Sequence, residues 1–174
     1  PFQFSLHVQH EVGKEPEHFE YLHNDNSDPR RPLAEKLVEW IPKDAPTVMA
    51  FNSSFENGVL TKLAKQCPDL NEHLLAIASK LVDPHPVFKA NVYHKQFRGG
   101  FKIKNIAPAL LGDEWDYGKL EVGDGRMAQV AFDKMLAQST PDKERSMYRE
   151  QLLKYCGQDT LAMVELTNWL YSQL

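Results

Sequence analysis

The chain has 174 residues, of which 42% are hydrophobic and 25% are charged, and these values are typical of one soluble globular domain with a substantial core. No apolar run approaches the roughly 20 residues of a membrane helix, and the first residues lack the basic and then apolar layout of a signal peptide. The net charge of −4 argues against a broad surface that coats nucleic acid. It still allows local binding through divalent cations, which supply positive charge where it is needed.

The two cysteines, Cys67 and Cys156, lie far apart and do not have the spacing of a metal site. We expect both to be reduced packing residues rather than a disulfide, as in a cytoplasmic protein.

The first forty residues predict two strands and a helix. Residues 1–8 alternate apolar and polar side chains, which is the pattern of a strand with one buried face. A turn at 13–16 and a second short run at 18–23 predict an antiparallel hairpin. A helix is expected over residues 32–41, because proline is tolerated in the first turn of a helix.

The next forty residues alternate between strand and helix patterns. Residues 47–51 are nearly all apolar, which is typical of a buried parallel strand. Helices are expected from residue 53 to just before residue 68 and over residues 70–79, followed by a short strand at 81–83. This order indicates an α/β fold.

The second half of the chain reads as a loop region followed by helices. Residues 84–125 are rich in glycine and proline and predict a loop with one short helix at 103–110. Residues 126–136 predict a helix. Thr140 and Pro141 are expected to cap a last helical region that breaks near Gly157. No repeat or domain boundary interrupts residues 1–174, which predicts a single domain.

Tyr155 and Asp159 are the first candidate site residues. Two residues four apart share one face of a helix, so the phenol would hold a water beside a metal that the carboxylate binds. The alternative is a half-buried tyrosine and a surface aspartate.

A second candidate site follows the predicted strand at 47–51. Asn52 ends that strand, and Glu56 would point back over its carboxyl end, where α/β sheets bind ligands. The alternative is structural, because Ser53 and Glu56 have the spacing of a capping box, and Asn52 is then only a residue that leaves the strand.

A third candidate lies at residues 97–110, where two glycines precede a basic and apolar run that opens a helix. Backbone N–H groups there, with Lys102 or Lys104, would approach a phosphate. The alternative is a glycine-rich turn that enters a helix.

Four segments, AFNSSFENGVL, LVD, GGFKIKNIAPAL and YCGQDTLAMVEL, occur in this order. Together they resemble the second and third motifs of the DEDD superfamily, the DnaQ-like 3′–5′ exonucleases with a ribonuclease-H-like fold. The chain looks closest to an uncharacterised bacterial family in that superfamily, in which PFQFSLHV, DPR, FE and YCxxDT recur. The similarity spans nearly the whole chain.

The resemblance implies roles for three residues. Glu56 would replace the second-motif aspartate as a metal ligand, Asp159 would be the third-motif carboxylate, and Tyr155 would position the attacking water. The implied cofactors are two Mg²⁺ or Mn²⁺ ions. Asp83 ends the strand that corresponds to the fifth of the superfamily, and a role as a turn or cap residue before Pro84 is the favoured one.

The resemblance also implies a substrate, single-stranded DNA or RNA. Asn52, Phe55, Lys102 and Lys104 are the residues we expect to contact it. No membrane partner is expected.

The resemblance also has a gap, because members of the superfamily begin with a strand that carries Asp-x-Glu. Only Pro1 precedes Phe2 here. We therefore expect an N-terminally truncated exonuclease domain that binds Mg²⁺ or Mn²⁺ weakly and degrades nucleic acid poorly.

The same gap affects the expected sheet, an α/β ribonuclease-H-like mixed sheet flanked by helices. Its strand order is 3-2-1-4-5, and the first, central strand is missing. Buried backbone groups need partners. We expect residues 1–8 to pair with residues 47–51, or another chain to lend a strand, as in a strand-exchanged dimer. The alternative function is a catalytically silent nucleic-acid-binding or scaffold domain of a larger protein.

Overall fold

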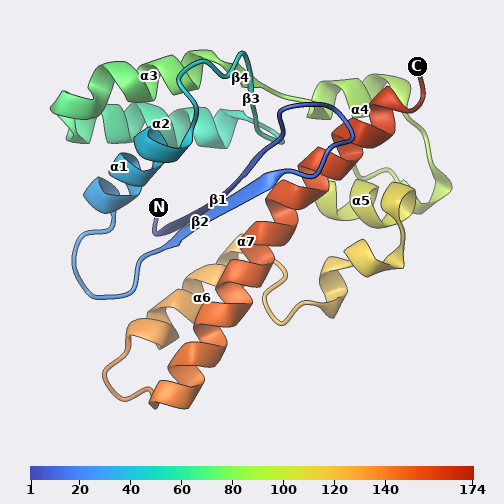
Figure 1. The fold of residues 1–174 in the computed structure, drawn as a ribbon. Helices are drawn as coiled ribbons and strands as arrows, with labels where there is room; N and C mark the ends of the chain where they lie inside the picture. Colours follow the sequence, from blue (N-terminus) through green and yellow to red (C-terminus); the bar gives the residue numbers. More distant parts are fainter.

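The computed structural model describes residues 1–174 and has a mixed α/β fold in which helices predominate (Figure 1). The strands are β1 (Gln3–Val8), β2 (Glu17–Leu22), β3 (Val48–Met49) and β4 (Leu81–Val82). The helices are α1 (Arg30–Trp40), α2 (Ser54–Gln66), α3 (Asn71–Ser79), α4 (His85–Asn91), α5 (Ile103–Leu111), α6 (Gly125–Leu136) and α7 (Asp142–Tyr171). Short 3₁₀ turns occupy Pro68–Leu70, Lys95–Phe97, Asp113–Trp115 and Tyr117–Lys119.

The strands form two separate two-stranded sheets. β1 and β2 are antiparallel, with a register from Gln3 opposite Leu22 to Val8 opposite Glu17, which confirms the predicted hairpin. β3 and β4 are parallel, which confirms the second predicted pair of strands.

The prediction that β1 pairs directly with β3 is wrong within this chain, and the strands do not join into one mixed sheet. Each strand pairs with only one neighbour. The N–H groups of Val48 and Ala50 donate to carbonyls of the β4 segment at 2.9 and 3.1 Å, and the whole of β1 lies in register with β2.

Three clusters of buried side chains form the core. The first joins α1, α2 and α3 through residues such as Leu33, Leu63 and Leu74, and one face of β1 packs against it. The second joins α6 to the first half of α7, and Phe2 stacks on Phe132 there with ring centroids 4.0 Å apart.

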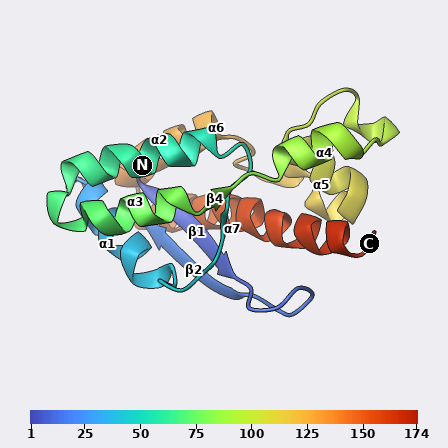
Figure 2. The same cartoon turned by 90° about the horizontal axis from the view of Figure 1, so that it is seen from above.

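The third cluster joins α4 and α5 to the second half of α7. Helix α7 therefore contributes to two of the three clusters. Figures 1 and 2 show it running beside α6 at one end and near α5 at the other.

The second face of the hairpin lies against α7 through polar groups. The hydroxyls of Ser5 and Thr160 are 2.7 Å apart, and Nδ1 of His7 is 2.8 Å from the Thr160 hydroxyl. The rings of His7 and His18 stack at 4.3 Å. Burial, and then the charge of His18, lowers the pKa of His7 to about 4, so this ring is neutral at pH 7.

Three expectations for the second half of the chain are wrong. The stretch predicted to be a loop with one helix also contains α4, because buried Phe88 holds this short helix on the core. Helix α7 continues through Gly157, since packing along its length outweighs the roughly 1 kcal/mol cost of one glycine. Of the two residues expected to cap α7, Pro141 occupies the N-cap position, but Thr140 does not cap the helix, because its hydroxyl donates to the carbonyl of Lys134 at the end of α6.

Both cysteines are free, and Cys67 is buried, as expected for packing residues. No helix combines the length and apolar composition needed to cross a bilayer.

Candidate active site

The site begins where β3 leads into α2, and Asp83 organises this turn. One oxygen of its carboxylate accepts from the backbone N–H groups of Asn52 and His85, both at 2.9 Å. The other accepts from the N–H of Ser53 at 3.0 Å. Asn52 has a φ of 61°, a left-handed conformation that asparagine adopts more readily than most residues. The cap role favoured for Asp83 is confirmed, and Asn52 is a strand-exit residue whose backbone is bound.

This arrangement decides against the capping box at α2. The Ser53 side chain makes no cap hydrogen bond, and its N–H, which Glu56 would accept in a capping box, already donates to Asp83. Glu56 is therefore not needed to cap the helix. Its Oε2 atom is buried and has no hydrogen-bond partner, which is costly for a polar atom unless a ligand completes it.

The pKa of Glu56 depends in part on Asp159, the carboxylate on α7. Burial raises the pKa of Glu56, a hydrogen bond from its own backbone N–H acts in the opposite direction, and the negative charges of Asp83 and Asp159 raise the pKa further. The structure thus brings carboxylates from α2 and α7 within range of each other's charge, although they lie about a hundred residues apart in sequence.

On α7, Asp159 is surrounded by aromatic hydroxyls. Burial raises its pKa, while the nearby hydroxyls of Tyr117 and Tyr155 and the charge of Lys104 act in the opposite direction. Burial, and then the charge of Asp159, raises the pKa of both phenols, which are therefore protonated at pH 7. The Tyr117 hydroxyl has no partner of normal hydrogen-bond geometry, so we regard it as a close neighbour of Asp159 rather than a bonded one.

Three of the residues expected to contact nucleic acid have exposed side chains. Phe55, in the first turn of α2, is 72% exposed beside Glu56. Lys104 is exposed and close enough to Asp159 to lower its pKa. Lys102 is the exposed N-cap residue of α5.

The ligand set can be tested against the two metal ions that the resemblance implies. Asp83 uses both oxygens for backbone N–H groups, so Glu56 and Asp159 are the free acids. No group of three or more His, Cys, Asp or Glu side chains is close enough to share a cation. Two divalent ions a few ångströms apart need several carboxylates, and the residues of this chain alone do not fit such a centre.

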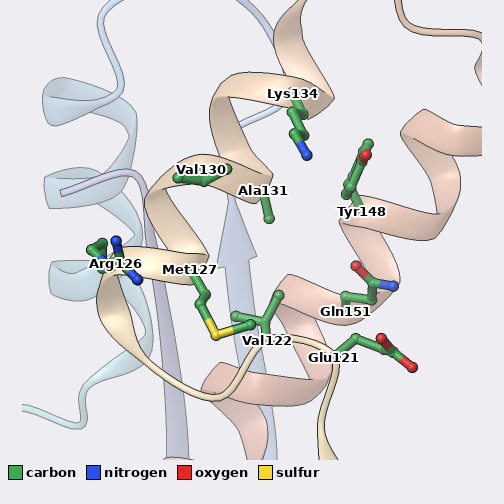
Figure 3. Close-up of a pocket in the computed structure, with 9 residues that line it drawn as sticks. All are labelled: Glu121, Val122, Arg126, Met127, Val130, Ala131, Lys134, Tyr148 and Gln151. Atoms are coloured by element: carbon green, nitrogen blue, oxygen red, sulfur yellow. The ribbon is translucent and has the colours of Figure 1, made fainter.

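Sequence reasoning missed Tyr117, which is only 5% exposed. It lies in a 3₁₀ turn of the glycine-rich region, where no periodic pattern marks a buried side chain. A pocket of about 300 Å³ lies elsewhere, between α6 and the first half of α7. Figure 3 shows Met127, Lys134 and Tyr148 at its walls, and none of the predicted site residues lines it.

The fold and this site define a mixed α/β domain in which a partly buried carboxylate in the first turn of α2 lies within range of the charge of a second one in the middle of α7, which has two neutral phenols beside it. The family model described as "Domain of unknown function (DUF2779)" matches residues 1–102, which is more than half of the chain. The chain belongs to this family. The match includes Asn52, Phe55 and Glu56 and ends before Tyr155 and Asp159. No curated protein and no solved structure matches the chain.

Proposed function

We propose that this chain forms part of a metal-dependent 3′–5′ exonuclease-type domain that hydrolyses single-stranded nucleic acid, with Glu56, Asp159 and Tyr155 at its reaction centre. The observation that carries the proposal is the buried Oε2 atom of Glu56, which has no hydrogen-bond partner. The charge of Asp159 contributes to the raised pKa of this residue. A protein maintains such an arrangement at a cost in stability, which is typical of functional sites.

Each side chain has a role that its chemistry allows. The protonated phenol of Tyr155 holds a water molecule beside Asp159 and orients it toward the terminal phosphodiester. When the water attacks, it gives up a proton to solvent as the new P–O bond forms; the bond from phosphorus to the 3′ oxygen of the preceding nucleotide breaks, and that leaving oxygen takes up a proton, so that a nucleoside 5′-monophosphate is released. Mg²⁺ or Mn²⁺ would supply charge stabilisation in a complete site, and Glu56 and Asp159 provide only part of its ligands.

The strand pairing supports the same proposal. In the superfamily order 3-2-1-4-5, β1 and β2 take positions 2 and 3, and β3 and β4 take positions 4 and 5. The observed pairs, β1 with β2 and β3 with β4, are those that this order retains without strand 1. A strand carrying Asp-x-Glu between β1 and β3 would satisfy both free edges and bring the remaining carboxylates close to Glu56.

The test is hydrolysis by a chain extended upstream to include an Asp-x-Glu strand. With Mn²⁺ and 5′-labelled single-stranded DNA or RNA, we expect stepwise shortening from the 3′ end, and little from the 174-residue chain. Asp159→Asn in the extended chain should lower the rate at least about 100-fold, and Tyr155→Phe should lower it about 10- to 100-fold. Glu150→Gln, an exposed carboxylate on α7, is the matched control. A folded extended chain that leaves both substrates intact contradicts the proposal.

The alternative is a catalytically silent nucleic-acid-binding or scaffold domain. Glu in place of Asp at position 56 favours it, as does the net charge of −4. Under this alternative, the extended chain binds single strands without shortening them, and Asp159→Asn leaves that binding unchanged.

A further inference from the structure

One part of the chain has a charge opposite to that of the whole. Residues 84–112, here called the α4–α5 segment, contain no Asp or Glu and five basic residues: Lys89, Lys95, Arg98, Lys102 and Lys104. The segment therefore carries a formal charge of +5 in a chain of −4. The rest of the molecule carries −9.

These five cations are free to bind an external anion. All five are exposed, and none forms an ion pair; every salt bridge in the molecule lies within residues 10–69. A cation without a carboxylate partner is not neutralised within the protein and attracts an anionic ligand at full charge. The local potential at this segment is therefore positive although the net charge of the chain is negative.

The segment is held in place by buried anchors between its cations. Phe88 and Phe97 are 0% and 1% exposed and pack with α7 in the third core cluster. Each is followed directly by an exposed cation, Lys89 or Arg98. Arg98 has a left-handed φ of 50° within a turn closed by the Gly100 N–H and the Phe97 carbonyl at 2.8 Å. Anchored cations lose less conformational freedom on binding than cations on a mobile loop.

An exposed aromatic residue lies between two of these cations in the sequence, Lys89 and Lys95. Tyr93, between α4 and the 3₁₀ turn at Lys95–Phe97, is 88% exposed. A large exposed ring within a basic surface is the combination that binds single-stranded nucleic acid, because bases stack on the ring while phosphates meet the cations. Toward its C-terminal end the segment approaches the candidate site, where the positive charge of Lys104 acts to lower the pKa of Asp159.

We propose that the α4–α5 segment is a binding track for single-stranded nucleic acid, with Tyr93 as its stacking platform and Lys89, Lys95 and Arg98 as phosphate contacts. The track leads toward Asp159. Its role in feeding a strand to that residue rests on the proposed function, whereas the binding itself does not.

The test measures binding of the 174-residue chain to fluorescent oligothymidylate by anisotropy, with EDTA present so that hydrolysis does not contribute. Lys89→Gln, Lys95→Gln and Arg98→Gln are combined and compared with a control of equal charge change, Lys62→Gln, Lys143→Gln and Arg149→Gln, all exposed. We expect the first set to weaken binding at least 10-fold at low salt. The slope of log affinity against log salt should become shallower by about 2, because each phosphate contact on a single strand contributes about 0.7. Equal binding by the two triple variants overturns the proposal.

The stacking contact is tested separately. Tyr93→Ala should weaken binding by about 10-fold with an unchanged salt slope, while Tyr93→Phe, which keeps the ring, should bind like the original chain. If Tyr93→Ala binds as well as Tyr93→Phe, the stacking role is wrong. Preferential binding to phosphatidylserine vesicles over the oligonucleotide would assign the track to a membrane surface and overturn the proposal.

The two proposals can fail independently. If binding depends on the α4–α5 segment but the extended chain does not hydrolyse nucleic acid, the exonuclease proposal is wrong and the binding-track proposal stands. If the extended chain hydrolyses nucleic acid but neutralising the three cations does not change binding, the binding-track proposal is wrong and the exonuclease proposal stands.

Discussion

Asp83, directly after β4, holds the backbone that follows β3 by accepting hydrogen bonds from the N–H groups of Asn52 and Ser53. It accepts a third from the N–H of His85. Asp83→Ala leaves these three N–H groups without their acceptor, so we expect the free energy of unfolding to fall by about 2–3 kcal/mol. Urea denaturation followed by circular dichroism measures the change. Asp44→Ala, an exposed turn residue without side-chain hydrogen bonds, should change stability by less than about 0.5 kcal/mol. Equal effects of the two substitutions would show that Asp83 is not the organising residue.

Glu56 should oppose folding when it is charged. Its pKa is raised by burial and by Asp83 and Asp159, so the native state binds its proton more tightly than the unfolded state does. This contribution to stability is present below the unfolded pKa and is lost as the pH rises through the folded pKa. At pH 7.5, Glu56→Gln should therefore raise the Tm by roughly 2–4 °C, and the difference should vanish near pH 4.

Thermal unfolding of both proteins across pH 4–8 tests this sign, with Glu150→Gln as the exposed control. A Glu56→Gln protein that melts at or below the original Tm at pH 7.5 would mean that the charged carboxylate has a stabilising partner.

Helix α7 carries a glycine that its 30 residues do not require. A Cβ atom at Gly157 would lie 3.7 Å from the His18 ring, which is ordinary van der Waals contact. Gly157→Ala should therefore stabilise the protein by about 0.5–1 kcal/mol, because alanine restricts the unfolded chain and favours the helix.

Gly99→Ala is the contrasting substitution, since Gly99 has a φ of 76° with open space around it. It should destabilise by about 1 kcal/mol. If urea denaturation shows Gly157→Ala to be the more harmful of the two, the helix is not continuous at that position.

At the scale of the whole molecule, α7 links the second and third clusters, so we expect these two to unfold together. Leu152 belongs to the second cluster and Leu166 to the third, with exposures of 0% and 1%. Leu152→Ala and Leu166→Ala should each cost about 2–5 kcal/mol. Each variant should unfold in one transition seen equally by circular dichroism and by tryptophan fluorescence. Separate transitions for the two probes would show that the clusters unfold independently.

Much of this architecture could be predicted from local patterns. Alternation over residues 1–8 and 18–23 predicted the hairpin, and apolar runs predicted β3 and β4 with two helices between them. These predictions succeed because periodicity reports which face of an element is buried, and the burial of neighbouring residues is a local property. The start of α2 at the carboxyl end of β3, which places Glu56 in the first helical turn, followed from the same reasoning, whereas Asp159 lies in the middle of an unbroken α7.

Local patterns were enough to locate the hairpin and every α-helix except α4, and to place the basic and acidic residues along the chain. Packing between distant segments sets the rest: the strands separate into two sheets, α7 continues through Gly157, and Asp83 rather than Glu56 binds the backbone that leads into α2. The physical reason is the same in each case. The partner that satisfies a backbone N–H group, or that buries a helix face, lies tens of residues away, and no local pattern records which of several possible partners it will be.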